Sequence, residues 1–145
     1  MIYLVHHADA VEPGADPQRP LSAAGRAHAE TLAIEAAARG VKPVAIWHSG
    51  KLRARQTAEP FLRLCNPLAE LSAIRGLQPT DPPEWIRDLM TGEERELMLV
   101  GHMPNLPRVL TLLVRGTEPP LLEFPLHGAI ALEPSGELWV EQWRL

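Results

Sequence analysis

The N-terminus combines a short apolar run with two adjacent histidines, and this combination constrains the fold more than any other segment. The run Met1–Val5 reads Met-Ile-Tyr-Leu-Val, and His6, His7, Ala8 and Asp9 follow it directly. A run of this kind predicts a buried strand, as in a parallel sheet covered by helices. Such sheets bind ligands just beyond the carboxyl ends of their strands. Because histidine acts as base, ligand or nucleophile near neutral pH, we expect chemistry at this strand end.

Composition limits the class of protein. The chain has 145 residues, of which 46% are hydrophobic, and we expect one domain over residues 1–145. The net charge of −4 argues against a nucleic-acid or other polyanion binder, so a positive site must be local. No apolar stretch reaches the ~18 residues of a membrane span. The single Cys65 and the lack of a basic leader predict a cytoplasmic protein without an internal disulfide.

Apolar spacing and turn residues predict the elements of the first half of the chain. A helix should run from a Ser22 cap to about Arg39. Its predicted buried stripe comprises Ala24, Ala27, Thr31, Ile34 and Ala38. A second strand is expected over residues 44–47. The helix that follows should reach about Leu64 and be kinked or split at Pro60.

The second half of the chain completes the predicted fold. We expect a short strand near residues 68–71, a short helix over 83–90, a buried strand over 96–100 and a helix capped by Asn105. Alternating residues in 130–132 and 138–143 predict a hairpin around Pro134-Ser135-Gly136. This order predicts a three-layer α/β/α sandwich with a mostly parallel central sheet and an antiparallel edge.

Three predicted strands end in similar polar residues. His6 and His7 end the first strand, His48-Ser49 the second, and His102 follows the strand over 96–100. The ends of parallel strands lie at the same edge of a sheet, so these side chains should converge. Arg53 falls in the first turn of the next helix, whose N-terminus favours anions. Histidines, an arginine and a helix N-terminus together predict a phosphate site.

Four segments of the sequence resemble one known family. They read Leu-Val-His-His-Ala-Asp-Ala over residues 4–10, Arg-Pro-Leu-Ser-Ala-Ala-Gly over 19–25, Ser-Gly-Lys-Leu-Arg-Ala-Arg-Gln-Thr over 49–57, and Leu-Val-Gly-His-Met-Pro-Asn-Leu over 99–106. Their order and spacing resemble the histidine phosphatase superfamily, which has a phosphoglycerate mutase-like fold. Within it, the chain is similar to the short SixA-type phosphohistidine phosphatases.

The resemblance implies a metal-independent phosphatase that needs no cofactor. It implies that His7 is the nucleophile and forms a transient phosphohistidine, and that Arg53 and His102 bind phosphate oxygens. Ser49, at the end of the second strand, is a further candidate for substrate binding. The implied substrate is a phosphorylated protein, carrying phosphohistidine, or a small phosphomonoester. Asp81 lies near where related phosphatases place their general acid.

Several roles stay open at this point. Asp9 and Glu84 are alternative general acids, and His127 is as consistent with a supporting role as with none. His6 stands where the family has arginine, and it is a candidate phosphate ligand as well as a candidate structural substitute. As a strand neighbour of His7 it should point to the opposite face, unless the backbone turns there.

Two alternatives to the phosphatase stay open, and the replacement of arginine at position 6 favours the first of them. Arginine offers a permanent charge and two hydrogen bonds, whereas histidine offers fewer. The loss of such a contact would favour a non-catalytic phosphate or phosphopeptide binder. A metal hydrolase would use His6, His7, His102 and an aspartate, although adjacent histidines on a strand make awkward co-ligands.

Overall fold

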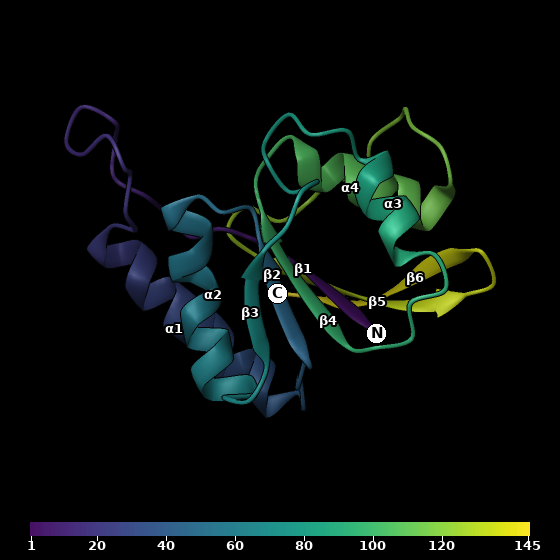
Figure 1. Ribbon diagram of the computed structural model, residues 1–145, viewed down its shortest axis with the longest axis horizontal. Coiled ribbons are helices and arrows are strands. Elements are labelled where there is room, and N and C mark those ends of the chain that lie inside the picture. Colours follow the sequence, from purple (N-terminus) through teal and green to yellow (C-terminus); the bar gives the residue numbers. More distant parts are fainter.

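A computed structural model describes all 145 residues and places six strands in one sheet (Figure 1). The spatial order of the strands is β3-β2-β4-β1-β5-β6. The first four are mutually parallel, whereas β5 pairs antiparallel with β1 and with β6. Their bounds are β1 Ile2–His6, β2 Ala45–His48, β3 Glu70–Ala73, β4 Leu97–Gly101, β5 Ala129–Ser135 and β6 Leu138–Arg144. The mostly parallel sheet with an antiparallel edge is therefore confirmed.

Four helices form the two outer layers. They are α1 (Ala23–Ala38), α2 (Leu52–Cys65), α3 (Glu84–Met90) and α4 (Asn105–Arg115). Figure 1 shows α1 and α2 together on one face of the sheet and α3 and α4 on the other. This arrangement is the predicted three-layer sandwich. No helix combines the length and the apolarity needed to cross a bilayer.

The central position of β1 in the sheet explains why residues 2–5 are hydrophobic. Ile2 and Leu4 are packed in the core with residues of α3 and α4, whereas Tyr3 and Val5 are packed with residues of α1 and α2. Because successive side chains of a strand alternate between faces, a central strand covered on both sides has no polar face. This burial holds the strand rigidly beneath the histidines at its end.

The buried face of α1 was predicted wrongly. The structure buries Gly25, Ala29, Leu32, Ala33 and Ala36, and all five residues of the predicted stripe are exposed. The helix is rich in alanine on every side, so stripes at helical spacing can be drawn in more than one direction. Contact with α2 and the sheet decides which stripe is buried.

Three further expectations need correction. The helix α2 continues through Pro60, so of the two expected outcomes the split does not occur; the nearby Ala58 and Phe61 are fully buried in the core. Asn105 does not cap α4: it is the first helical residue, and its buried amide donates to the Asp81 carbonyl at 2.9 Å. The strand β3 begins at Glu70, two residues later than predicted.

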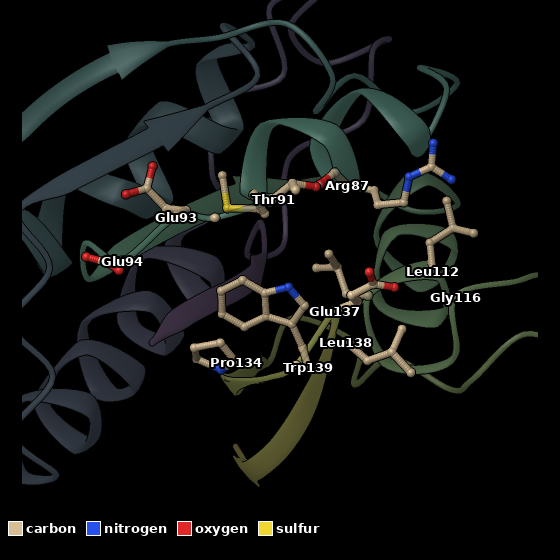
Figure 2. Close-up of a pocket in the computed structure, with 14 residues that line it drawn as sticks. Arg87, Thr91, Glu93, Glu94, Leu112, Gly116, Pro134, Glu137, Leu138 and Trp139 are labelled. Carbon is tan, nitrogen blue, oxygen red and sulfur yellow. The ribbon is translucent and has the colours of Figure 1, made fainter.

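The largest cavity lies at the opposite end of the sheet from the histidines. It measures about 670 Å³ and is lined by the ends of α3 and α4 and by the turn between β5 and β6 (Figure 2). The strand register places this turn beside the start of β1, whereas the histidines follow its end. This cavity is therefore separate from the predicted phosphate site.

Candidate active site

Three adjacent parallel strands bring the predicted site residues to one edge. β1 and β2 flank β4, and His7, Ser49 and His102 each follow the last residue of one of these strands. The His7 amide donates to the Gly101 carbonyl at 3.1 Å, which ties the two strand ends together. The convergence predicted from the strand ends is present in the structure.

His102 lies against His7 and is held by Ser49. The ring centroids of His7 and His102 are 4.9 Å apart. The Ser49 hydroxyl is 2.6 Å from the His102 Nε2 atom, and His102 is only 1% exposed. The other ring nitrogen, Nδ1, is buried without a protein partner. Because buried polar atoms are nearly always hydrogen-bonded, this nitrogen indicates a place for a polar ligand.

Arg53 supplies the positive charge of the site. It lies in the first turn of α2, and its Nε atom is also buried without a partner. Its positive charge is one of the causes that lower the pKa of His7 and of His102, after burial. No carboxylate forms an ion pair with Arg53. An unpaired guanidinium beside an unpaired imidazole nitrogen suits an oxyanion.

Hydrogen bonding leaves the outer nitrogen of His7 free to attack. The Nδ1 atom of His7 lies 2.7 Å from the Ala8 carbonyl. A carbonyl only accepts, so Nδ1 carries the proton and Nε2 keeps its lone pair. The structure thus orients this ring as a nucleophile would need.

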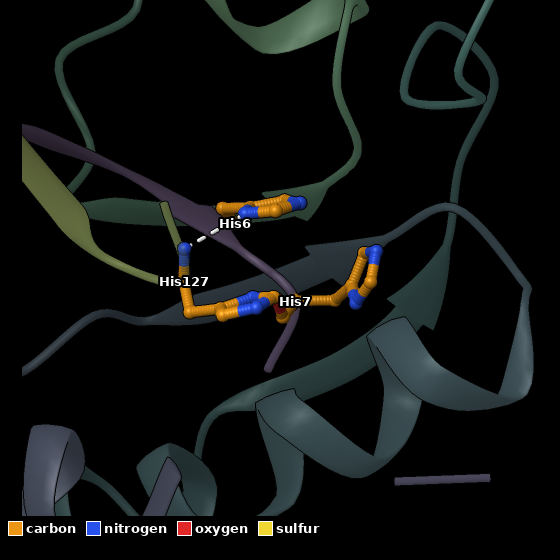
Figure 3. A group of neighbouring side chains, drawn as sticks. All are labelled: His6, His7 and His127. Atoms are coloured by element: carbon orange, nitrogen blue, oxygen red, sulfur yellow. Dashed lines mark hydrogen bonds between the residues drawn. The ribbon is translucent and has the colours of Figure 1, made fainter. Parts of the chain in front are cut away.

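The hydrogen bonds of His6 assign one ring nitrogen as an acceptor and leave the other as a donor. The backbone amide of His127 donates to the His6 Nδ1 atom at 2.8 Å, drawn as the dashed line in Figure 3. In the neutral ring the proton is then on Nε2. The ring centroids of His6 and His7 are only 4.5 Å apart. The chain leaves the strand after His6, so the two rings are neighbours and do not point to opposite faces.

His127 touches both N-terminal histidines, so it lies where a supporting residue would be needed. Its ring stacks on that of His6 at 4.9 Å with an interplanar angle of 6°, and its Nδ1 donates to the His7 carbonyl at 2.7 Å. The residue adopts a left-handed backbone conformation with φ of 53°. Such strain in a non-glycine residue is typical of functional sites. Sequence alone gave no signal beyond the presence of a histidine at a turn.

Burial keeps the pocket histidines, His6, His7 and His102, neutral. It lowers the pKa of His6 to about 3, of His7 to about 4 and of His102 to about 3, and nearby positive charge adds to the effect. At pH 7 all three imidazoles are therefore uncharged in the protein alone. A neutral ring is the form in which histidine is nucleophilic.

Two motif residues of α2 fix the loop that follows the nucleophile. The Thr57 hydroxyl accepts from the Ala8 amide at 2.9 Å, and the Gln56 side chain accepts from the Leu21 amide at 2.8 Å. On the other side of this loop, a Cβ atom on Gly25 would lie 2.0 Å from the Asp9 carbonyl oxygen. The sequence motif therefore contains residues that hold the loop in place, a role that spacing alone did not reveal.

No carboxylate approaches the pocket histidines through a hydrogen bond. One oxygen of Asp81 accepts from the amides of Gly76 and Gln78, both at 3.0 Å, and so shapes its own loop. Asp9 accepts from the Ser22 hydroxyl at 2.7 Å, and Glu84 begins α3. Asp81 as general acid stays a prediction.

Three histidines form a cluster that invites a test for metal binding. One ring nitrogen each of His6, His7 and His127 lies within 4.8 Å of the others. The His6 Nδ1 atom already accepts the His127 amide, however, so its Nε2 carries a proton and has no lone pair for a metal. Two free nitrogens remain, which is fewer than the three protein ligands of a catalytic zinc site. The cluster therefore does not favour the metal hydrolase.

Comparison with known families agrees with the geometry of the site. The family model of the histidine phosphatase superfamily (branch 1) matches residues 2–103. This stretch contains His7, Ser49, Arg53 and His102. The chain belongs to the histidine phosphatase superfamily, and its phosphoglycerate mutase-like fold is shared with solved members. No curated protein sequence gives a significant match.

Solved structures of similar fold include the SixA type named above. The protein histidine phosphatase SixA complexed with tungstate has a TM-score of 0.85 at 20% identity, with 99% of this chain and 95% of that chain covered. A putative phosphohistidine phosphatase SixA from Agrobacterium tumefaciens gives 0.79 at 28% identity, covering 99% and 96%. A phosphoserine phosphatase from Entamoeba histolytica gives 0.74 at 14% identity, covering 99% and 95%.

Proposed function

We propose that this protein is a metal-independent phosphatase that uses His7 as nucleophile and acts on protein phosphohistidine or another phosphomonoester. The observation that carries the proposal is the meeting of three groups at one sheet edge. The neutral His7 ring has a free Nε2, and two buried nitrogens, Arg53 Nε and His102 Nδ1, have no protein partner. The Ser49 oxygen accepts from the Lys51 amide at 3.2 Å, which leaves its hydroxyl proton for His102 Nε2, and Nδ1 then carries the ring proton as a donor. A phosphoryl group offers acceptors for both donors and an electrophile for the free nitrogen.

The reaction proceeds in two displacements. The Nε2 atom of His7 attacks phosphorus, the bond to the leaving group breaks, and the leaving group departs with its electron pair. Arg53 and His102 hold the phosphoryl oxygens in line with the nucleophile and offset the negative charge. Water then attacks the phosphohistidine, which releases phosphate and restores the neutral imidazole.

The arrangement of acids favours phosphohistidine over an alkyl phosphate as substrate. An alkoxide leaving group needs a proton from a general acid. The candidate carboxylates of Asp9 and Asp81 are each engaged in hydrogen bonds within their own loops. An imidazole leaving group depends less on such an acid. The similar SixA structure with tungstate, an oxyanion shaped like phosphate, also supports a phosphate-binding site here.

One observation supports a second candidate function, a phosphate binder without turnover. His6 stands in the place of the usual arginine, its pKa is about 3, and it offers one N–H donor in place of a charged pair. A pocket with this weaker contact binds phosphate while stabilising the transition state less well.

Turnover by the His7→Ala variant distinguishes these functions. Hydrolysis of p-nitrophenyl phosphate and of a phosphohistidine peptide should stop in His7→Ala and continue in the control His48→Asn. The Asn oxygen replaces the His48 Nδ1 atom that accepts the Gly50 amide at 3.0 Å. Wild-type protein that binds phosphate and hydrolyses neither compound would establish the binder. Full activity in His7→Ala would refute the nucleophile.

A further inference from the structure

A second cavity lies beside Ser49, one of the residues at the proposed phosphate site. It measures about 470 Å³, and its lining includes Ser49, Arg75, Gln78 and Trp85. The Ser49 hydroxyl is hydrogen-bonded to His102, so this lining residue connects the cavity wall to the proposed phosphate site. Gln78 donates to the Ser49 carbonyl at 2.6 Å and fixes that wall. A molecule with its phosphoryl group at His7 therefore has this cavity beside it.

The cavity contains an arginine that is oriented and unpaired. The Arg75 guanidinium carbon lies 4.6 Å from the centroid of the Trp85 ring, and Trp85 is 41% exposed. Stacking on an aromatic face holds a guanidinium while leaving its N–H groups free at the edge. No carboxylate pairs with Arg75, whereas six other arginines form ion pairs. Asp81 also lines the cavity, and one of its oxygens is taken by two backbone amides.

Three basic side chains influence the pocket histidines. The charged side chains that influence the pKa values of the pocket histidines are Arg19, Lys51 and Arg53, and no carboxylate is among them. The whole chain nevertheless carries a net charge of −4. These three cations favour the binding of anionic ligands near the histidines.

We propose that Arg75 and Trp85 form a subsite for a carboxylate side chain of a phosphoprotein substrate, close in sequence to its phosphorylated residue. This inference rests on the proposed function, because it places the phosphorylated residue at His7. A guanidinium edge binds a carboxylate with two hydrogen bonds, and the indole packs against the side-chain methylenes. A cavity of 470 Å³ is large enough for one or two side chains of an acidic peptide segment.

Two phosphohistidine peptides that differ only in flanking residues test the subsite. One carries glutamates beside the phosphohistidine, and the other carries lysines. Wild-type protein should have the higher kcat/KM for the glutamate peptide. The ratio of kcat/KM for the glutamate peptide to kcat/KM for the lysine peptide should fall roughly threefold to fivefold in Arg75→Gln, which is the effect of one partly exposed ion pair. In Arg75→Glu the preference should reverse, so that the lysine peptide has the higher kcat/KM. The control Arg87→Gln removes an equal charge from the separate cavity of Figure 2 and should keep the wild-type ratio.

Binding to the His7→Ala variant separates this inference from the proposed function. Calorimetry with both peptides measures recognition without turnover, so it applies whether or not the protein is an enzyme. Tighter binding of the glutamate peptide that is lost in His7→Ala/Arg75→Gln supports the subsite. Equal affinity for both peptides, or an unchanged preference in the Arg75 variants, would overturn it. Wild-type protein that binds the glutamate peptide more tightly but hydrolyses neither peptide would refute only the phosphatase.

Discussion

Replacing His6 with arginine should raise activity and lower stability at the same time. His6 has a pKa of about 3, so at pH 7 it presents one uncharged N–H donor. Arginine presents a permanent charge and two parallel donors. The difference is worth about 2–4 kcal/mol of transition-state stabilisation. That energy corresponds to an increase in kcat/KM on the order of a hundredfold.

The stability cost comes from the group that now holds His6. The His127 amide donates to the His6 Nδ1 atom, and an arginine side chain offers no acceptor in its place. A buried donor without a partner costs about 1–3 kcal/mol. His6 is also only 4% exposed, so the longer side chain must displace the stacked His127 ring or extend into the pocket.

The assay compares kcat/KM for p-nitrophenyl phosphate with the free energy of unfolding in urea for three proteins. These are the wild type, His6→Arg and the control His6→Asn. The control keeps an oxygen near the Nδ1 position for the His127 amide but lacks the Nε2 donor. It should remain folded and lose about tenfold in activity, the effect of one lost hydrogen bond. A folded His6→Arg variant that is no more active than wild type would refute the assignment of His6 as a phosphate ligand.

Three further predictions concern the surroundings of the nucleophile. Gly25→Ala should lower the free energy of unfolding by about 3 kcal/mol in urea titrations, because its Cβ would lie 2.0 Å from the Asp9 carbonyl oxygen. The control is Gly14→Ala, since a Cβ at that position has no atom within 4 Å. Equal stabilities of the two variants would contradict the close packing at Gly25. Ser49→Ala should reduce kcat about fivefold to tenfold by releasing His102, and an unchanged kcat would show that the hydroxyl does not position the ring. The pocket histidines have a folded-state pKa below that of the unfolded chain, so unfolding takes up protons between pH 6.5 and about 4. Stability should therefore fall as the pH is lowered through this range, by at most about 4 kcal/mol per pH unit, and stability that is flat with pH would contradict buried neutral rings.

The sequence predicted the fold well wherever apolar residues form contiguous runs. The strands β1 and β4 are covered on both faces, so their composition alone identifies them. The buried face of α1 could not be predicted because alanines surround the helix. Asn105 was misassigned as a cap because its amide bonds to Asp81, 24 positions earlier, and no local pattern reveals such a contact.

Some residues of the candidate site could be predicted from the sequence, and others are visible only in the folded chain. Strand ends and motifs predicted that His7, Ser49 and His102 would meet, because parallel strands share an edge. The role of His127 depends on a turn between α4 and β5 that returns the chain to the end of β1. The partner of His6 is 121 positions away in the sequence, so only the folded chain shows that its proton lies on Nε2.

Trapping the phosphorylated enzyme tests the central claim most directly. Rapid mixing with a radiolabelled phosphohistidine peptide, followed by an alkaline quench and peptide mapping, identifies any residue that carries phosphate during turnover. We predict label on His7 that is stable in base and released in acid, and none in His7→Ala. Normal turnover with phosphate on another residue, or with no labelled protein at any mixing time, would contradict the mechanism.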